Sequence, residues 1–157
     1  MRATSEGHIE RGLPAAAATS LAAVALAALV LGCPIQRPPI PRDYIPFRDA
    51  LRDSVAEITY AELAGRPATE ERLRERLAFF ATIAQTDSLL AALQSDATLR
   101  PLADPVAETL VAVLDSDVAD GGVRKAFRKP EGQRLAVDAV VIGFGNALRR
   151  LEVKRRG

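Results

Sequence analysis

The sequence predicts an all-α protein: a small bundle of four to five helices after an N-terminal apolar helix and a proline-rich tether. Beyond residue 47, apolar residues recur at spacings of three and four, which places them on one face of a helix. Proline, glycine and aspartate separate these segments at positions where helices begin and end. Ala and Leu dominate the composition and aromatic residues make up only 4%, so we expect aliphatic side chains to fill the core.

The first two helices are predicted over residues 47–64 and 70–85. A glycine and a proline end the first, because glycine suits the left-handed residue after a helix and proline cannot continue one. Thr69 is the expected N-cap of the second, and Glu70 in its first turn suits the positive end of the helix dipole. The apolar face of the first helix comprises Phe47, Ala50, Leu51, Val55 and Ile58, and that of the second comprises Leu73, Leu77, Phe80 and Ala84.

Three shorter segments follow, each bounded by residues that start or stop helices. Asp87 is expected to cap a helix over residues 88–95. Asp104 is expected to cap a helix over residues 105–118, in which Pro105 takes the first position. Two glycines then precede a short basic piece, VRKAFRK, which stops at a proline.

The last segment, residues 131–153, is predicted to be the most buried helix, because apolar residues cover it nearly all round. Its β-branched run over residues 137–142 leaves a strand as the alternative. Gly143 and Gly145 lower helix stability, so they either permit close contact with a neighbouring backbone or mark a break.

The scarce residue types exclude several chemistries. One cysteine cannot form an internal disulfide, a redox CxxC pair or a four-thiolate zinc site. One histidine, His8, cannot supply an HExxH pair, and the sequence has neither a GxxxxGK[ST] nor a GxGxxG motif. The net charge of +1 argues against broad nucleic-acid binding. We therefore expect no catalytic residue, no cofactor, no metal and no nucleic-acid partner.

An uncharged apolar run, AAAATSLAAVALAALVL, occupies residues 15–31 and is followed by a glycine and by Cys33, the only cysteine. Its length and position are typical of a secretory signal, although the flank before it carries only a small positive charge. The sequence LVLGC, residues 29–33, resembles the lipobox of bacterial lipoprotein precursors. That motif has an aliphatic residue, a small residue before the cleavage point and then an obligatory cysteine.

This resemblance implies that residues 1–32 are a signal peptide and that the Cys33 thiol receives a diacylglyceryl group. Cleavage before Cys33 and acylation of its amino group would attach the chain to a membrane, with about 0.8 kcal/mol for each buried methylene. In a cell with two membranes, Pro34 rather than aspartate after the cysteine favours the outer one by the usual lipoprotein sorting pattern. Three alternatives stay open: a retained signal anchor, a cleaved signal with an unmodified cysteine, and a buried core helix.

Residues 33–46 comprise the lipid-attachment cysteine and a tether that contains five prolines. Proline at this density favours an extended polyproline chain, which reaches up to roughly 40 Å from a bilayer. The helical domain is accordingly predicted over residues 47–157.

Charge is segregated along the chain. Residues 87–120 hold one basic and seven acidic residues (−6), and residues 121–157 hold ten basic and three acidic ones (+7). Either the two parts neutralise each other within the bundle, or the basic part faces anionic lipid headgroups or an acidic protein. The basic residues considered for that contact are Arg124, Lys125, Arg128, Lys129, Arg149, Arg150, Lys154, Arg155 and Arg156.

Together these features predict a lipid-anchored, exported bacterial envelope protein with a structural or interaction role and no enzymatic activity. We expect it at the periplasmic face of the outer or inner membrane, or at the cell surface. Two alternatives belong to other functional classes: a single-pass accessory subunit that retains its N-terminal helix, and a helical binder of an apolar small molecule.

Overall fold

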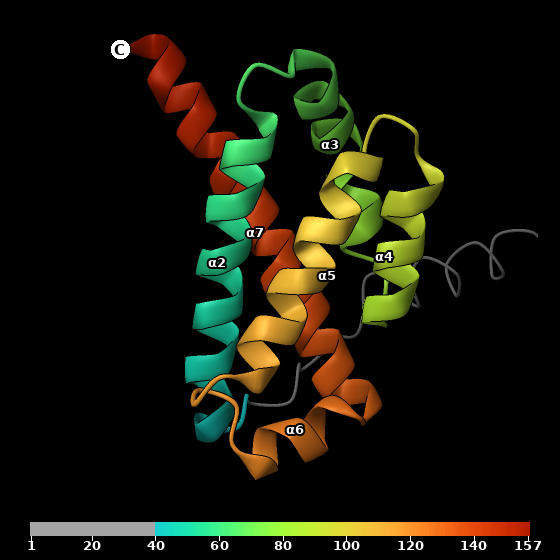
Figure 1. Ribbon diagram of the computed structural model, residues 1–157, viewed down its shortest axis with the longest axis vertical. Helices are drawn as coiled ribbons and strands as arrows, with labels where there is room; N and C mark the ends of the chain where they lie inside the picture. The colour runs from blue at the N-terminus through green and yellow to red at the C-terminus, as the bar shows by residue number, and fades with distance from the viewer. Residues whose placement is uncertain (1–39) are drawn as a thin grey trace, which may run out of the picture. The chain divides into compact units, whose positions relative to one another are not determined.

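A computed structural model describes residues 40–157, so the predicted signal segment, Cys33 and most of the tether lie outside the described residues. The described part is all-α, as predicted, and contains no strand (Figure 1). The basic piece before Pro130 forms a helix of its own, which brings the α-helices of this part to six. A short 3-10 helix precedes them, and the elements are η1 (Arg42–Tyr44), α2 (Ile45–Leu63), α3 (Pro67–Phe80), α4 (Thr86–Ser95), α5 (Arg100–Asp115), α6 (Gly121–Phe127) and α7 (Pro130–Arg156).

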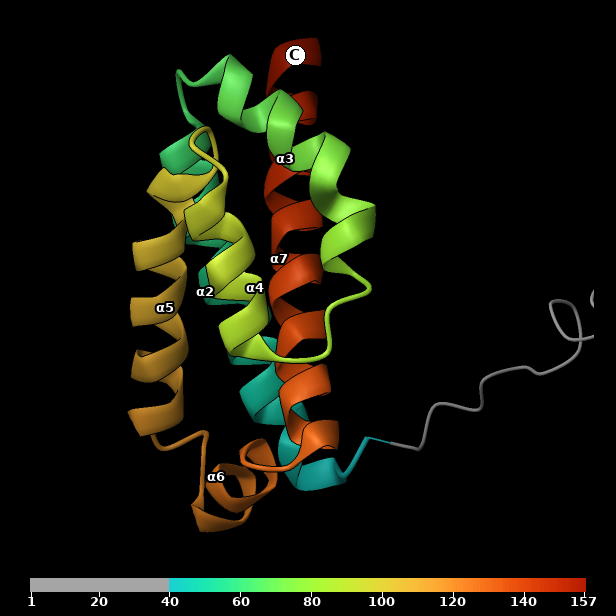
Figure 2. The same ribbon diagram turned by 90° about the vertical axis from the view of Figure 1, so that its right-hand side faces the viewer.

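The bundle is built around α2 and α7, which lie side by side and run in the same direction (Figures 1 and 2). α5 packs on α2, α3 packs on α7, and α4 contacts both α5 and α7. α6 lies across the end at which α2 and α7 begin, next to η1. The C-terminus of α7 therefore lies at the end of the bundle away from α6.

The core is mainly aliphatic, as the composition predicts, and its few aromatic rings sit at helix contacts. Phe47, Phe80 and Phe144 are fully buried. The rings of Phe80 and Phe144 join α3 to α7 with 6.2 Å between their centroids. Burying a side chain of this size contributes about 1.5–3 kcal/mol, so these rings secure the helices around α7. The other large buried side chains are Leu51, Val55, Leu63, Leu73, Leu89, Leu93, Leu99, Leu102 and Val106.

The last segment is helical throughout, so the strand alternative for residues 137–142 is wrong. Gly143 explains how α2 approaches it so closely. A Cβ at this position would lie 2.8 Å from the Arg52 carbonyl oxygen and 2.9 Å from a methyl group of Val55. Gly145 has more room, because its nearest neighbour would be a Leu77 methyl group at 3.9 Å. The sequence expectation of close backbone contact is thus confirmed for the first glycine only.

Two prolines occupy helix positions that differ from the predicted ones. α3 begins with Pro67 at its first position and Arg66 as the N-cap, rather than with Thr69 as the cap. Proline suits that position because the missing N–H has no intrahelical acceptor there. Pro105 lies inside α5, which begins five residues earlier at Arg100. Pro105 has no N–H to donate to the carbonyl of residue 101, four positions earlier. Residue 101 is exposed, so solvent can take the place of that donor.

Two aspartates lie at helix starts, and only the first differs from its predicted role. α4 starts at Thr86, so Asp87 is a first-turn residue instead of the cap. Asp120 is the N-cap of α6, and its carboxylate accepts the Val123 amide at 2.8 Å.

The folded unit begins at Ile40 instead of residue 47. Tyr44, predicted to lie in the tether, is 2% exposed, and its hydroxyl donates to the Gly132 carbonyl at 2.8 Å. Pro46 is compatible with α2 because it falls in the first turn, where a missing N–H costs no intrahelical hydrogen bond. Residues 40–46 thus belong to the body and close the end from which α2 and α7 start.

Candidate functional site

The folded unit begins earlier in the chain than predicted, so fewer residues separate Cys33 from it. Cys33 lies outside the described residues, and the folded unit begins seven positions later at Ile40. Seven residues extend to at most about 25 Å, instead of the roughly 40 Å expected for a fourteen-residue tether.

The basic part of the chain is divided between the two ends of α7. α6 and its exit contribute Arg124, Lys125, Arg128 and Lys129 at one end, whereas Arg149 to Arg156 lie in the last turns of α7 at the other. α7 has 27 residues, and at 1.5 Å per residue it is about 40 Å long. The basic residues therefore form two separate surfaces.

At the tether end, four exposed cations lie near the start of the folded unit: Arg42, Lys125, Arg128 and Lys129. We call them the tether-end cations. Within residues 40–157, none of them forms an ion pair. Arg124 differs, because it donates to the Leu114 carbonyl at 2.9 Å and so satisfies the end of α5.

At the other end of α7, two arginines pair with carboxylates on neighbouring helices. Arg155 binds both oxygens of Glu70 on α3, at 3.1 and 2.5 Å, and Glu70 is only 3% exposed. Arg150 donates to Glu57 on α2 at 2.6 Å. In the described part, the only ion pair of the acidic segment 87–120 joins Asp96 to Arg72. Part of the basic segment is thus neutralised within the bundle. Its partner carboxylates belong to α2, α3 and α7 and not to the acidic segment 87–120.

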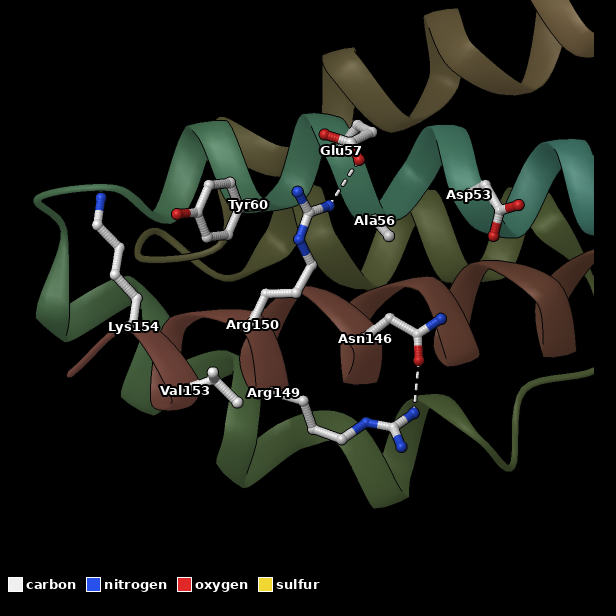
Figure 3. Close-up of a pocket in the computed structure, with 9 residues that line it drawn as sticks. All are labelled: Asp53, Ala56, Glu57, Tyr60, Asn146, Arg149, Arg150, Val153 and Lys154. Atoms are coloured by element: carbon white, nitrogen blue, oxygen red, sulfur yellow. Dashed lines mark hydrogen bonds and ion pairs between the residues drawn. The ribbon is translucent and has the colours of Figure 1, made fainter. Parts of the chain in front are cut away.

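A surface groove of about 720 Å³ lies between the second halves of α2 and α7 (Figure 3). Ala56, Tyr60 and Val153 supply its apolar surface, and Val153 is 71% exposed. The guanidinium of Arg150 lies over the Tyr60 ring at 4.7 Å, which is a cation–π contact. The remaining lining residues are Asp53, Glu57, Asn146, Arg149 and Lys154.

The groove carries charges of both signs, and hydrogen bonds shift the pKa of two of these groups. Arg52 donates to Asp53 at 2.7 Å and lowers the pKa of that carboxyl below its usual value. The hydrogen bond to Glu57 raises the pKa of Arg150. Arg149 donates to the Asn146 side chain at 2.5 Å, so no carboxylate neutralises it within the described residues.

The sequence prediction missed this groove and the burial of Glu70. Tyr60 falls outside the apolar face assigned to the first helix, and that mismatch is the signal that points to the groove; Val153 gave none, because the last helix was expected to be apolar nearly all round. Glu70 lies in the first turn of its helix, as predicted, but nothing local in the sequence places Arg155 beside it, 85 residues later. Among residues 40–157, no three His, Cys, Asp or Glu side chains gather in a metal-binding cluster, and no helix is long and apolar enough to cross a membrane.

Comparison with protein families, curated proteins and solved structures found no match to this chain.

Proposed function

We propose that this chain is a lipid-anchored, exported bacterial envelope protein whose helical body serves a structural or interaction role and not a catalytic one. One observation carries the proposal. The only cysteine ends an apolar run in a lipobox-like sequence, and the folded unit begins seven residues after it. Acyl chains on Cys33 would anchor the new N-terminus, and the short link would hold the body at the membrane.

The interaction role draws its support from the surface that α2 and α7 present. The groove between them combines an apolar strip with a rim of both charges, and two large apolar side chains of α7 are exposed, Ile142 at 47% and Val153 at 71%. Isolated exposed apolar residues are common, but together with a groove they mark a surface suited to a partner.

Acyl labelling of the chain tests the anchor. The wild-type protein should incorporate a labelled fatty acid, and Cys33→Ser should lose the label because no other thiol exists in the sequence. Pro34→Ser is the matched control: it changes the adjacent residue, keeps the thiol and should label normally. Equal labelling of the wild type and the Cys33→Ser variant would refute the assignment of Cys33.

Site-specific photo-crosslinking in intact cells tests the interaction role. A crosslinker at Val153, in the groove, should give a discrete adduct with an envelope protein. Val111 on α5 is the control position, because it is also exposed, at 57%, but does not line the groove. The same adducts from both positions, or none from Val153, would contradict an interaction through the groove.

A further inference from the structure

The tether-end cations and the point at which the chain leaves the folded body lie at the same end of the bundle. α6 contacts η1, and the ring of Phe127 at the end of α6 packs against Phe47 at the start of α2, with 6.3 Å between centroids. The Tyr44–Gly132 hydrogen bond fixes η1 to the first turn of α7. These contacts hold α6 beside η1, at the end of the bundle where α2 and α7 begin (Figure 2).

The charge at the exit of α6 is locally one-sided. Residues 121–130 contain four cations and no acidic residue, and all four are exposed without an ion pair in the described part of the chain, Arg124 donating to the Leu114 carbonyl instead. The acidic residues of this end lie to either side: Asp115, Asp117 and Asp120 precede α6, and Asp43 and Glu131 are near neighbours in sequence of the cations. Asp120 uses its carboxylate to cap α6. The basic group is thus at the exit of α6, beside the start of α2.

We infer that the tether-end cations contact anionic phospholipid headgroups and orient the body end-on at the membrane. This inference rests on the proposed function, which places Cys33 in the bilayer surface. The chain from Cys33 reaches at most about 25 Å, so Ile40 and the cations beside it come within range of the headgroups. Charges act over only about 8 Å at physiological ionic strength. The far end of α7 lies about 40 Å from its first residue, so the basic residues there are too distant from the headgroups to contribute.

The inferred contact leaves the groove accessible. The lining residues Asn146, Arg149 and Val153 belong to the second half of α7, away from α6. In an end-on orientation this half projects from the membrane.

Each basic side chain near an anionic surface strengthens membrane binding roughly fivefold. Two such side chains therefore strengthen it roughly thirtyfold.

Quenching of a fluorophore by lipids with a nitroxide headgroup measures this orientation. The full chain is reconstituted into phosphatidylcholine vesicles with or without phosphatidylglycerol, with a label on an introduced cysteine at Pro130 or at Val153. Both positions are exposed, and acylation of Cys33 leaves the introduced thiol as the only free one. The Pro130 label should be quenched much more strongly in the anionic vesicles, and the Val153 label should be quenched in neither.

Charge reversal identifies the residues responsible. Arg128→Glu with Lys129→Glu should remove the extra quenching of the Pro130 label, as should high salt. Arg149→Glu with Lys154→Glu is the matched control for membrane contact: it reverses one arginine and one lysine at the far end, on the groove, and should leave the quenching of the Pro130 label unchanged. A Pro130 label that is quenched equally in both vesicle types would overturn the inference and leave an acidic protein as the counterpart of these cations.

The test of the cation contact can be separated from the test of the lipid anchor. Mass spectrometry of the same sample reports whether Cys33 is acylated or the N-terminal apolar segment is retained. Either anchor brings the tether end to the bilayer, so the difference between neutral and anionic vesicles reports the cation contact in both cases. Absence of acylation, with quenching retained in a Cys33→Ser background where the introduced cysteine is the only thiol, would refute the anchor alone. Acylation without quenching would refute the orientation alone.

Discussion

Removal of Arg155 should destabilise the bundle by about 1–2 kcal/mol, because it leaves a buried carboxylate with half of its partners. Glu70 is 3% exposed and accepts two hydrogen bonds from Arg155 and one, at 3.1 Å, from Arg74. A hydrogen bond to a charged group contributes about 1.5–3 kcal/mol. The Arg155 side chain is 60% exposed, so solvent screening reduces its share, and Arg74 still pairs with the carboxylate in the Arg155→Ala variant.

Urea unfolding followed by circular dichroism measures this loss as a lower midpoint at unchanged m. Arg156→Ala is the control, because Arg156 pairs with Glu152 on its own helix and is 77% exposed; we expect a change below about 0.5 kcal/mol. Combining Arg155→Ala with Glu70→Gln should restore part of the stability, since the buried charge is then absent. If Arg155→Ala and Arg156→Ala unfold at the same urea concentration, Glu70 does not depend on Arg155 and the reasoning fails.

Three further substitutions test the packing and the buried polar groups. Gly143→Ala should cost about 1–3 kcal/mol because its Cβ would collide with α2, whereas Gly145→Ala should gain up to about 1 kcal/mol from helix propensity. Thr59→Val should raise stability by about 1 kcal/mol, because the Thr59 hydroxyl is buried without a hydrogen-bond partner. Tyr44→Phe should cost about 1 kcal/mol at neutral pH through loss of the bond to the Gly132 carbonyl. Burial raises the pKa of Tyr44 from 10.0 to about 12, so the unfolded chain loses the hydroxyl proton at a lower pH than the folded chain does. The stabilisation by Tyr44 is therefore complete below pH 10 and is lost as the pH rises from 10 to 12.

A specific result would contradict each of these three predictions. Equal unfolding midpoints for the two glycine variants would show that α2 and α7 are not in close contact at Gly143. A destabilised Thr59→Val variant would show that the hydroxyl has a partner, and a wild type whose high-pH slope matches that of Tyr44→Phe would show that Tyr44 is not buried. Urea midpoints measured across pH separate these outcomes.

Local sequence signals predicted the helices well where one strong signal acted alone. The apolar spacing in α2 and α7, and the interruption at Gly65 with its φ of +79°, placed those elements to within a few residues. They were less accurate at prolines, because proline fits the first turn of a helix and also an extended tether. Pro46 and Pro67 are in the first turns of α2 and α3, and only tertiary contacts such as that of Tyr44 decide between the two.

The candidate surfaces depended on contacts that no local pattern encodes. The basic segment reads as one block in sequence, yet the length of α7 places Lys129 and Arg149 at different ends of the bundle. The groove exists because α2 and α7 are parallel neighbours, with Glu57 opposite Arg150 across 93 residues of sequence. The Cys33 assignment, by contrast, comes from the sequence motif alone.

The intact mass of the chain extracted from its membrane tests the central claim most directly. The lipid-anchor account predicts a species that consists of residues 33–157 plus a diacylglyceryl group and an N-acyl chain. A mass that retains residues 1–32, or one that begins at residue 33 without acyl groups, would contradict it.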